Sequence, residues 1–168
     1  MGNPTPSLRL SCEYFPPKTE DGKLKLLAAH ERLQALSPEF FSVTYGAGGS
    51  TRSNTRDMVL ELKRRGSSVA PHLSFGGDDE SLVLELLQVY RDNGIRRLVA
   101  LRGDMPSGMG GMSQMVYAAE LVAFVRRHTG GHFAIEVAAY PEMHPQAPDM
   151  VSDVRFLKRK FDAGADSA

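Results

Sequence analysis

Short apolar runs alternate along the chain with longer segments in which apolar residues recur every three or four positions. Apolar runs between turn residues are typical of buried parallel strands, whereas the wider spacing is typical of amphipathic helices. The runs predict strands at Phe40–Tyr45, Val69–Leu73, Leu98–Leu101 and Ala134–Ala139, and the alternation of apolar and polar residues over Leu8–Tyr14 predicts a first strand there. The spaced segments predict helices at Gly22–Leu36, Thr51–Arg65, Asp79–Asn93, Ser113–His128 and Asp149–Ala163.

Two of the predicted helices show their apolar side plainly. The leucines of the first share one helical period and are Leu24, Leu27, Leu33 and Leu36. The last helix carries a single apolar stripe made of Met150, Val154, Leu157 and Phe161. A glycine follows each predicted helix from the second to the fifth, as is usual at a helix C-terminus. These glycines are Gly66, Gly94, Gly130 and Gly164.

The strand–helix pairs repeat at roughly 30 residues, which is the pattern of βαβ units in a parallel sheet. The fold class is therefore α/β, within a single segment that covers residues 1–168, of which 1–7 are proline-rich and expected to be frayed. Two architectures remain open. One is an open doubly wound sheet, and the other is a (β/α)₈ TIM barrel of which this chain carries the first five units. In the barrel interpretation, residues 163–168 are the turn before a sixth strand.

Composition excludes several classes of function. Lysine plus arginine and aspartate plus glutamate each number 20 in the 168 residues, so bulk charge predicts neither a nucleic-acid nor a membrane-surface partner. Cys12 is the single cysteine, which excludes an internal disulfide framework. The N-terminus has no apolar signal core, and no apolar run approaches the length of a membrane span. We therefore expect a cytoplasmic protein.

Polar side chains follow the predicted strands at their carboxyl ends, beginning with the apolar run that leads into Arg102 and Asp104. In an α/β barrel, that end of the strands faces the active site. Each such residue taken alone has an ordinary explanation as packing or as solvated surface. Their occurrence after all the strands predicts a shared site, to which the other strands contribute Glu13, Tyr14, Thr44, Tyr45, His72, Tyr140, Glu142 and His144.

Several common motifs are missing. No G-x-G-x-x-G sequence follows a predicted strand, so a Rossmann dinucleotide site is not supported. The loop around Gly108–Gly111 lacks the lysine of a phosphate loop and is interpreted as a flexible loop or lid. His72, His132 and His144 do not have zinc-ligand spacing, and Ser42 has no nucleophile elbow around it, so we expect no metal.

The chain resembles the methylenetetrahydrofolate reductase family in six segments that occur in the family's order. The likeness extends from about Leu8 to the last residue. The segments are Cys12–Pro17, Ser42–Ala47, Ala70–Leu73, Ala100–Asp104, Ala138–Pro145 and Leu157–Ala165.

This resemblance implies a (β/α)₈ barrel with noncovalently bound FAD. It implies reduction of 5,10-methylenetetrahydrofolate to 5-methyltetrahydrofolate by NADH or NADPH, in one-carbon metabolism and methionine biosynthesis. The implied partners are the folate and the nicotinamide nucleotide, with a homo-oligomer expected for the full-length protein. The family's later strands carry further folate and nicotinamide contacts and are not part of this chain.

The resemblance also implies roles for individual residues. The general acid matches Glu13, while Asp104 is implied to serve both the folate and the reactivity of the flavin, and Thr44 is implied to contact substrate. The implied flavin-binding positions are Thr44, Tyr45, His72, Arg102, Gly103, Asp104, Ala118, Tyr140, His144, Ala147, Asp153, Phe156, Arg159 and Lys160. The match at Ala118 depends on a preceding loop that is longer than in many bacterial members.

The chemistry of these residue types agrees with the implied reaction. Opening the bridging methylene of the substrate requires a proton on the departing nitrogen, which is work for a general acid such as Glu13. Arg102, Arg159 and Lys160 supply cations suited to a diphosphate, while a charge at Asp104 would tune the flavin potential. Two alternatives remain: a noncatalytic truncated fragment, and an unrelated phosphate-binding barrel lyase or isomerase, because fold does not fix function.

Overall fold

A computed structural model describes residues 9–45, 49–75, 80–102 and 117–168 of the chain, with backbone placement alone for residues 49–52. Five strands form one sheet, and they are β1 Ser11–Tyr14, β2 Phe40–Val43, β3 Val69–Leu73, β4 Arg97–Ala100 and β5 Ala134–Val137. The helices between and after them are α1 Glu20–Gln34, α2 Gly49–Arg64, α3 Glu80–Asp92, α4 Ala118–Thr129 and α5 Met150–Asp162.

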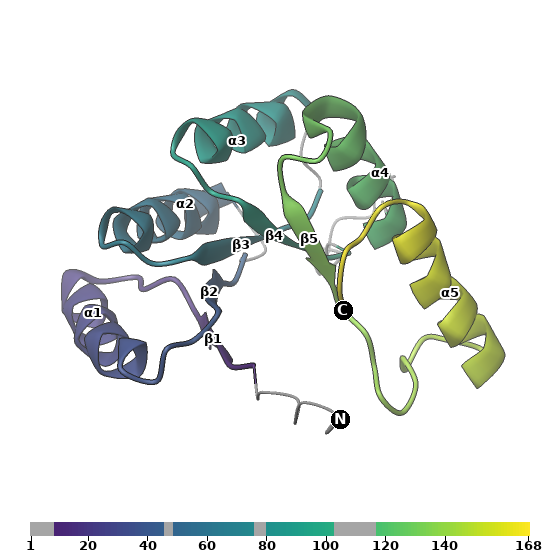
Figure 1. Cartoon of the computed structure of the whole chain (residues 1–168), viewed down its shortest axis with the longest axis horizontal. Helices are drawn as coiled ribbons and strands as arrows, with labels where there is room; N and C mark the ends of the chain where they lie inside the picture. The colour runs from purple at the N-terminus through teal and green to yellow at the C-terminus, as the bar shows by residue number, and fades with distance from the viewer. Residues whose placement is uncertain (1–8, 46–48, 76–79, 103–116) are drawn as a thin grey trace, which may run out of the picture.

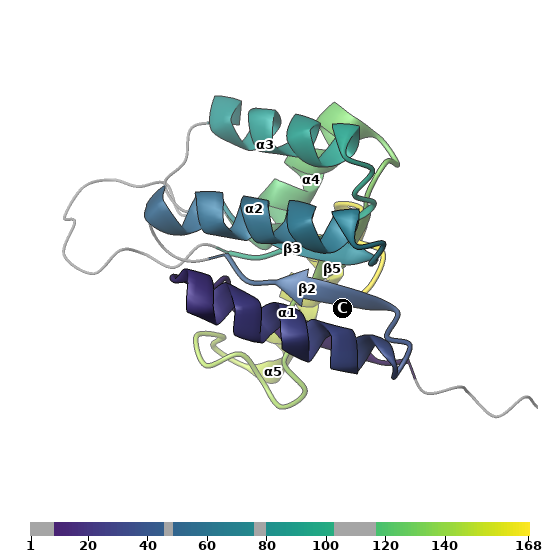
Figure 2. The same cartoon turned by 90° about the vertical axis from the view of Figure 1, so that its left-hand side faces the viewer.

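The five strands are all parallel, and their order in the sheet is their order in the chain. The helices form an arc outside the strands, with α1, α2 and α3 side by side (Figures 1 and 2). A doubly wound sheet would reverse its strand order and carry helices on both faces. The described part of the chain does neither, which favours the barrel-type arrangement of five successive β/α units.

The two faces of the sheet have different compositions because successive side chains of a strand point to opposite faces. The face toward the helices is apolar and buried, and its members include Tyr14, Phe41, Val43, Val69, Leu73, Leu98, Ala100, Ile135 and Val137. The opposite face, which we call the inner face, carries Glu13, Ser42, His72, Val99 and Glu136, as the strand register requires. The main core therefore lies between the sheet and the helical layer.

The capped ends of the helices follow from their sequences. Thr19 precedes α1, and its hydroxyl accepts a hydrogen bond from Gly22 N at 3.1 Å. Asp149 does the same for α5, with its carboxylate 2.7 Å from Ser152 N. Tyr117 is extended at the start of α4, so that helix begins at Ala118 and not at Ser113 as predicted from the sequence. Residues 113–116 lie outside the described part of the chain.

The predicted apolar side of α1 is partly wrong. Leu24 and Leu36 are 66% and 61% exposed, while the helix buries Leu27 and His30. α1 is the first helix of the layer and has α2 as its only neighbouring helix in the described chain, so part of its apolar surface has nothing to pack against (Figure 2).

A buried histidine orients the inner side of α1. His30 Nδ1 lies 3.2 Å from the Tyr14 hydroxyl, and His30 Nε2 lies 2.9 Å from Ser67 Oγ. Tyr14 also stacks on Phe41, with ring centroids 5.5 Å apart. Burial lowers the pKa of His30, assisted by the Arg65 guanidinium, and burial raises the pKa of Tyr14 to about 12. This polar network joins α1 to β1 and to the connection before β3.

The predicted apolar stripe of α5 lies on one face of the helix, but most of its residues are exposed. Met150 and Val154 are 51% and 59% exposed, and only Leu157 packs partly against the core. α5 contacts α4 on one side, and the sheet ends just beyond β5 (Figure 1). The stripe therefore extends past the edge of the sheet that would cover it.

The C-terminal segment continues the sheet by a single bridge. Ser167 pairs in parallel with Glu136, next to a hydrogen bond of 3.0 Å from Val137 N to the Ser167 carbonyl. Arg126 of α4 fixes this segment through the Gly164 carbonyl at 2.9 Å and the Asp166 carboxylate at 2.6 Å. Gly164 has φ +112°, and a Cβ there would lie 2.9 Å from Arg126 Cγ, so only glycine fits. The predicted turn over residues 163–168 thus leads directly into strand pairing.

One buried hydroxyl in α3 provides a test of this packing. Tyr90 is fully buried, and among the described residues its hydroxyl is the one buried side-chain polar atom without a hydrogen-bond partner. Burial raises the Tyr90 pKa. We expect Tyr90→Phe to increase the free energy of unfolding by about 1 kcal/mol, because it removes an unpaired buried polar group. Urea unfolding measures this, with the exposed Tyr117→Phe as the matched control, and a loss of stability in Tyr90→Phe would contradict the packing described.

Candidate active site

Glu13 meets His72 on the inner face of the sheet. The two residues come from β1 and β3, and Glu13 Oε2 lies 3.1 Å from His72 Nε2. Ser42 of β2 lies between them, with its hydroxyl 3.4 Å from the same carboxylate oxygen. Three consecutive parallel strands therefore bring together a carboxyl, a hydroxyl and an imidazole at their carboxyl ends, which is the edge where the sequence predicts the site.

Glu13 and His72 differ in their exposure to solvent. The His72 side chain is 9% exposed, whereas the Glu13 side chain is 52% exposed. Burial lowers the pKa of His72, and the neighbouring Glu13 carboxylate opposes this by its charge and its hydrogen bond. A buried imidazole whose neutral form is favoured thus lies beside a carboxyl that is accessible to solvent.

The backbone of β2 is fixed where the strand ends. Thr55 of α2 is fully buried, and its hydroxyl donates a hydrogen bond of 2.9 Å to the Thr44 carbonyl. Thr44 N in turn donates to the Tyr14 carbonyl at 2.9 Å. Thr44 and Tyr45 are half-buried at this edge and follow Val43, the register partner of Tyr14.

Tyr14 is the residue for which the prediction of a strand-end site role is wrong. It points away from Glu13 because neighbouring residues of a strand face opposite sides of the sheet. Its ring packs against Phe41 and its hydroxyl meets His30, so Tyr14 belongs to the core.

The Arg102 side chain contacts the segment that follows β5. Its Nη2 donates a hydrogen bond of 2.7 Å to Gln146 Oε1. Gln146 N is itself 3.1 Å from His144 Nδ1, and the His144 ring contacts the Tyr140 ring with centroids 4.6 Å apart. A cation and two aromatic rings from the ends of β4 and β5 are thereby gathered at one place. Gly103 and Asp104 lie outside the described residues.

The first turn of α5 supports the same segment. Asp153 accepts a hydrogen bond of 3.1 Å from His144 N, and Ala147 N donates to the His144 carbonyl at 2.8 Å. These contacts give the chain after β5 a defined turn. Glu142 in that turn is exposed.

The cations of α5 are not equivalent. Lys160 Nζ donates to the Ala138 carbonyl at 2.7 Å, at the end of β5, and burial lowers its pKa while Asp153 opposes the shift. Arg159 lies over the Phe156 ring at 5.6 Å from the centroid. Lys158 instead pairs with Asp162 at 2.6 Å on the exposed side of the helix. Lys160 is thus directed toward the end of the sheet, and Lys158 is not.

The structure brings most of the predicted residues to the carboxyl edge of the sheet. It forms two clusters, one of Glu13, Ser42 and His72 and one of Arg102, Tyr140, His144 and Gln146. Ala118 is buried at the first position of α4. Sequence reasoning missed Ser42, Thr55 and Gln146 as members of the site. Ser42 could have been found by its place on the inner face opposite Glu13, whereas nothing local marks Gln146.

Toward the amino end of β4, the inner face carries charged residues that pair with one another. Arg97 at the start of β4 pairs with Glu136 of β5 at 3.1 Å and with Glu39 just before β2. Its guanidinium also lies over the Phe40 ring, 4.9 Å from the centroid. The paired charges connect β2, β4 and β5, and Arg97 lies at the amino end of its strand, where residues in a barrel serve stability more than catalysis.

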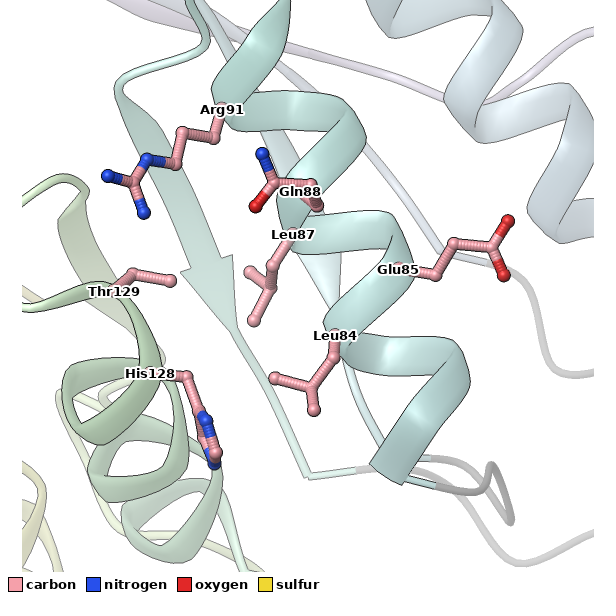
Figure 3. A pocket seen from close by; sticks show the side chains of 7 residues that line it. All are labelled: Leu84, Glu85, Leu87, Gln88, Arg91, His128 and Thr129. Atoms are coloured by element: carbon pink, nitrogen blue, oxygen red, sulfur yellow. The ribbon is translucent and has the colours of Figure 1, made fainter.

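A cavity of about 360 Å³ lies away from both clusters. It is formed between α3 and α4, and Figure 3 shows its lining by Leu84, Glu85, Leu87, Gln88, Arg91, His128 and Thr129. Of the residues predicted for the site, none that the structure describes lines this cavity. Among the helices in the described ranges, none is long and apolar enough to cross a membrane.

Solved structures with a similar arrangement are distant in sequence. A crystal structure of 2,3-dimethylmalate lyase, of the PEP mutase/isocitrate lyase superfamily, aligns with a TM-score of 0.55 at 14% identity. That alignment covers 96% of this chain and 56% of the lyase chain. At this identity the likeness concerns the fold alone and does not favour a lyase or isomerase.

Sequence comparison gives a much closer relationship. A 5,10-methylenetetrahydrofolate reductase of Pectobacterium carotovorum subsp. carotovorum is 43% identical over 162 residues, which cover 96% of this chain and 53% of that protein. The protein of that name from Escherichia coli K12 is 41% identical with the same coverage. A methylenetetrahydrofolate reductase (NADH) 1 of Arabidopsis thaliana is 38% identical, over 93% of this chain and 29% of its own length.

The chain thus spans about half the length of the bacterial relatives it matches. The sequence model described as methylenetetrahydrofolate reductase matches residues 4–168, which include both clusters at the carboxyl edge of the sheet. The resemblance drawn from the six sequence segments is confirmed, and the chain belongs to the methylenetetrahydrofolate reductase family.

Proposed function

We propose that this chain carries the proton-donating and flavin-binding half of a reductase that converts 5,10-methylenetetrahydrofolate to 5-methyltetrahydrofolate with NADH or NADPH. The observation that carries the proposal is the Glu13–His72 pair at 3.1 Å on the inner face, in a chain of this family. The product would feed one-carbon metabolism and methionine biosynthesis. A closed eight-unit barrel, and a cytoplasmic homo-oligomer for the full-length protein, are part of the same proposal.

The proton is the first chemical requirement. The bridging carbon of the substrate cannot accept hydride until one of its two carbon–nitrogen bonds has opened to an iminium. The electron pair of that bond moves to nitrogen, which must take a proton as the bond breaks. Glu13 is an accessible carboxyl at the carboxyl edge of the sheet, with about half of its side chain exposed to solvent.

The second requirement is a place for FAD, which when bound supplies hydride transfer between the nicotinamide and the folate. The donor set at the ends of β4 and β5 fits such a group. Arg102 and Lys160 offer cations for a diphosphate, and Tyr140 and His144 offer an aromatic surface beside them. Thr44, Tyr45, Ala118, Ala147, Asp153, Phe156 and Arg159 are proposed to complete the binding positions with His72 and Gly103.

Asp104 is proposed to act on the flavin and the folate together. A carboxylate near the flavin disfavours negative charge on the reduced ring and thereby lowers its tendency to accept electrons. The residue lies outside the described part of the chain, so this role rests on the family resemblance.

A direct test of the proposed function uses the purified full-length protein. We expect the absorption spectrum of an oxidised flavin, loss of that spectrum on addition of NADH or NADPH, and its return on addition of methylenetetrahydrofolate with formation of 5-methyltetrahydrofolate. A colourless protein, or one that reduces no folate, would contradict the proposal.

Substitution of Glu13 tests the proton donor separately. In Glu13→Gln we expect flavin binding and flavin reduction by the nicotinamide to persist, while oxidation of the reduced protein by methylenetetrahydrofolate slows by about 10²–10⁴-fold. An amide has the shape of the acid without its proton. Stopped-flow absorbance separates the two half-reactions, and a folate half-reaction at the wild-type rate would exclude Glu13 from the role.

The Glu13–His72 pair can be tested without turnover. The carboxylate raises the His72 pKa against the effect of burial, so the imidazole of Glu13→Gln should titrate at a lower pH than that of the wild type. Imidazole resonances followed by NMR against pH report this shift. The exposed His128 serves as the internal control, and an unchanged His72 titration would mean that the two side chains do not pair in solution.

A further inference from the structure

The two oxygens of the Glu13 carboxyl have different surroundings. Oε2 lies within reach of two donors, His72 Nε2 at 3.1 Å and Ser42 Oγ at 3.4 Å. Oε1 has no hydrogen-bond partner among the residues that the structure describes. The carboxyl is therefore held by one oxygen and presents the other.

The two donors are much more deeply buried than the group they hold. Ser42 and His72 are 5% and 7% exposed, and each belongs to a strand that is paired on both sides. Ser42 is the direct register partner of Glu13, and His72 lies two residues beyond Ala70, the register partner of Ser42 in β3. The glutamate side chain, with its several rotatable bonds, would lose its orientation without these contacts.

The protonation state of His72 suits this arrangement. Burial lowers the pKa of His72 and so favours the neutral imidazole, which can donate from Nε2 without forming an ion pair. Oε2 accepts that hydrogen bond whether Glu13 is a carboxylic acid or a carboxylate. The contact can thus persist through the proton transfer.

We propose that His72 and Ser42 are positioning residues that hold Glu13 by Oε2 and leave Oε1 as the atom that delivers the proton. This inference rests on the proposed function and names the atom from which the proton is transferred. As the carbon–nitrogen bond of the substrate breaks, the bond pair moves to nitrogen and the proton passes to it from Oε1. Glu13 is left as a carboxylate, whose charge is then stabilised by the two donors at Oε2.

Ser42 gives the cleaner test because it is not among the proposed flavin-binding residues. In the full-length protein, Ser42→Ala and His72→Leu each remove one donor, while Ser42→Thr and His72→Gln keep a donor at a similar position. Ser68→Ala, an exposed serine before β3, is the matched control. Flavin content is measured for every variant, so that the rates refer to loaded protein.

We expect the folate half-reaction to slow by about tenfold to hundredfold in His72→Leu and by less in Ser42→Ala, as for loss of a hydrogen bond to a charged group. Flavin reduction by the nicotinamide should be unchanged in Ser42→Ala, and the donor-keeping variants should recover most of the rate. In a Glu13→Gln background the same substitutions should have little further effect, because they act through Glu13.

Three results would overturn the inference. Equal slowing of both half-reactions would indicate a general structural role, and full additivity with Glu13→Gln would show that the donors do not act through that carboxyl. Wild-type folate rates in both Ser42→Ala and His72→Leu would show that neither residue positions Glu13. A wild-type protein whose flavin is reduced but never reoxidised by the folate would instead overturn the proposed function, and this inference with it.

Discussion

The arrangement of this chain depends on the sheet being covered by helices on one face only. Each strand pairs with its sequence neighbour, and each connecting helix returns on the same side (Figure 1). Strand side chains alternate between the two faces, so every second residue enters the core beneath the helices and the others face inward. The inner positions are thus available for polar groups, which the core between sheet and helices would exclude unless they were paired.

The inner face is divided along the strand direction. At the amino end of β4, Arg97 pairs with two carboxylates, those of Glu39 and Glu136. At the carboxyl ends, Glu13 is engaged through one oxygen and half-exposed. Arg97 thus joins strands through its ion pairs, whereas Glu13 keeps one oxygen for the proposed proton transfer.

Sequence periodicity predicts the elements well because both patterns arise from burial. β3 has the predicted bounds, and the other strands lie within a residue or a few of theirs. The errors occur where periodicity carries no information about neighbouring elements. Leu24 has the spacing of a core residue but is exposed, because α1 has a neighbouring helix on one side only in the described chain. His30, a polar residue, takes the buried place because Tyr14 and Ser67 satisfy its two nitrogens.

The site was predictable at the level of the sheet edge and not at the level of contacts. Parallel strands bring their carboxyl ends together, so Glu13 and His72 had to be near one another. The role of Gln146 depends on the path of the chain after β5, which no local pattern specifies. Tyr14 follows Glu13 directly, and the alternation of faces alone excludes it from the site.

The neighbour-to-neighbour pairing of the strands also bears on how the molecule is built. Each strand after β1 pairs with the strand that precedes it in the chain, and Ser167 bridges to β5 in the same way. No pairing among the described strands waits for a distant part of the polypeptide, which keeps the loop-closure entropy of each step small. A growing chain could add one strand and one helix at a time as it leaves the ribosome, with Glu13, Ser42 and His72 assembled once the third strand is in place.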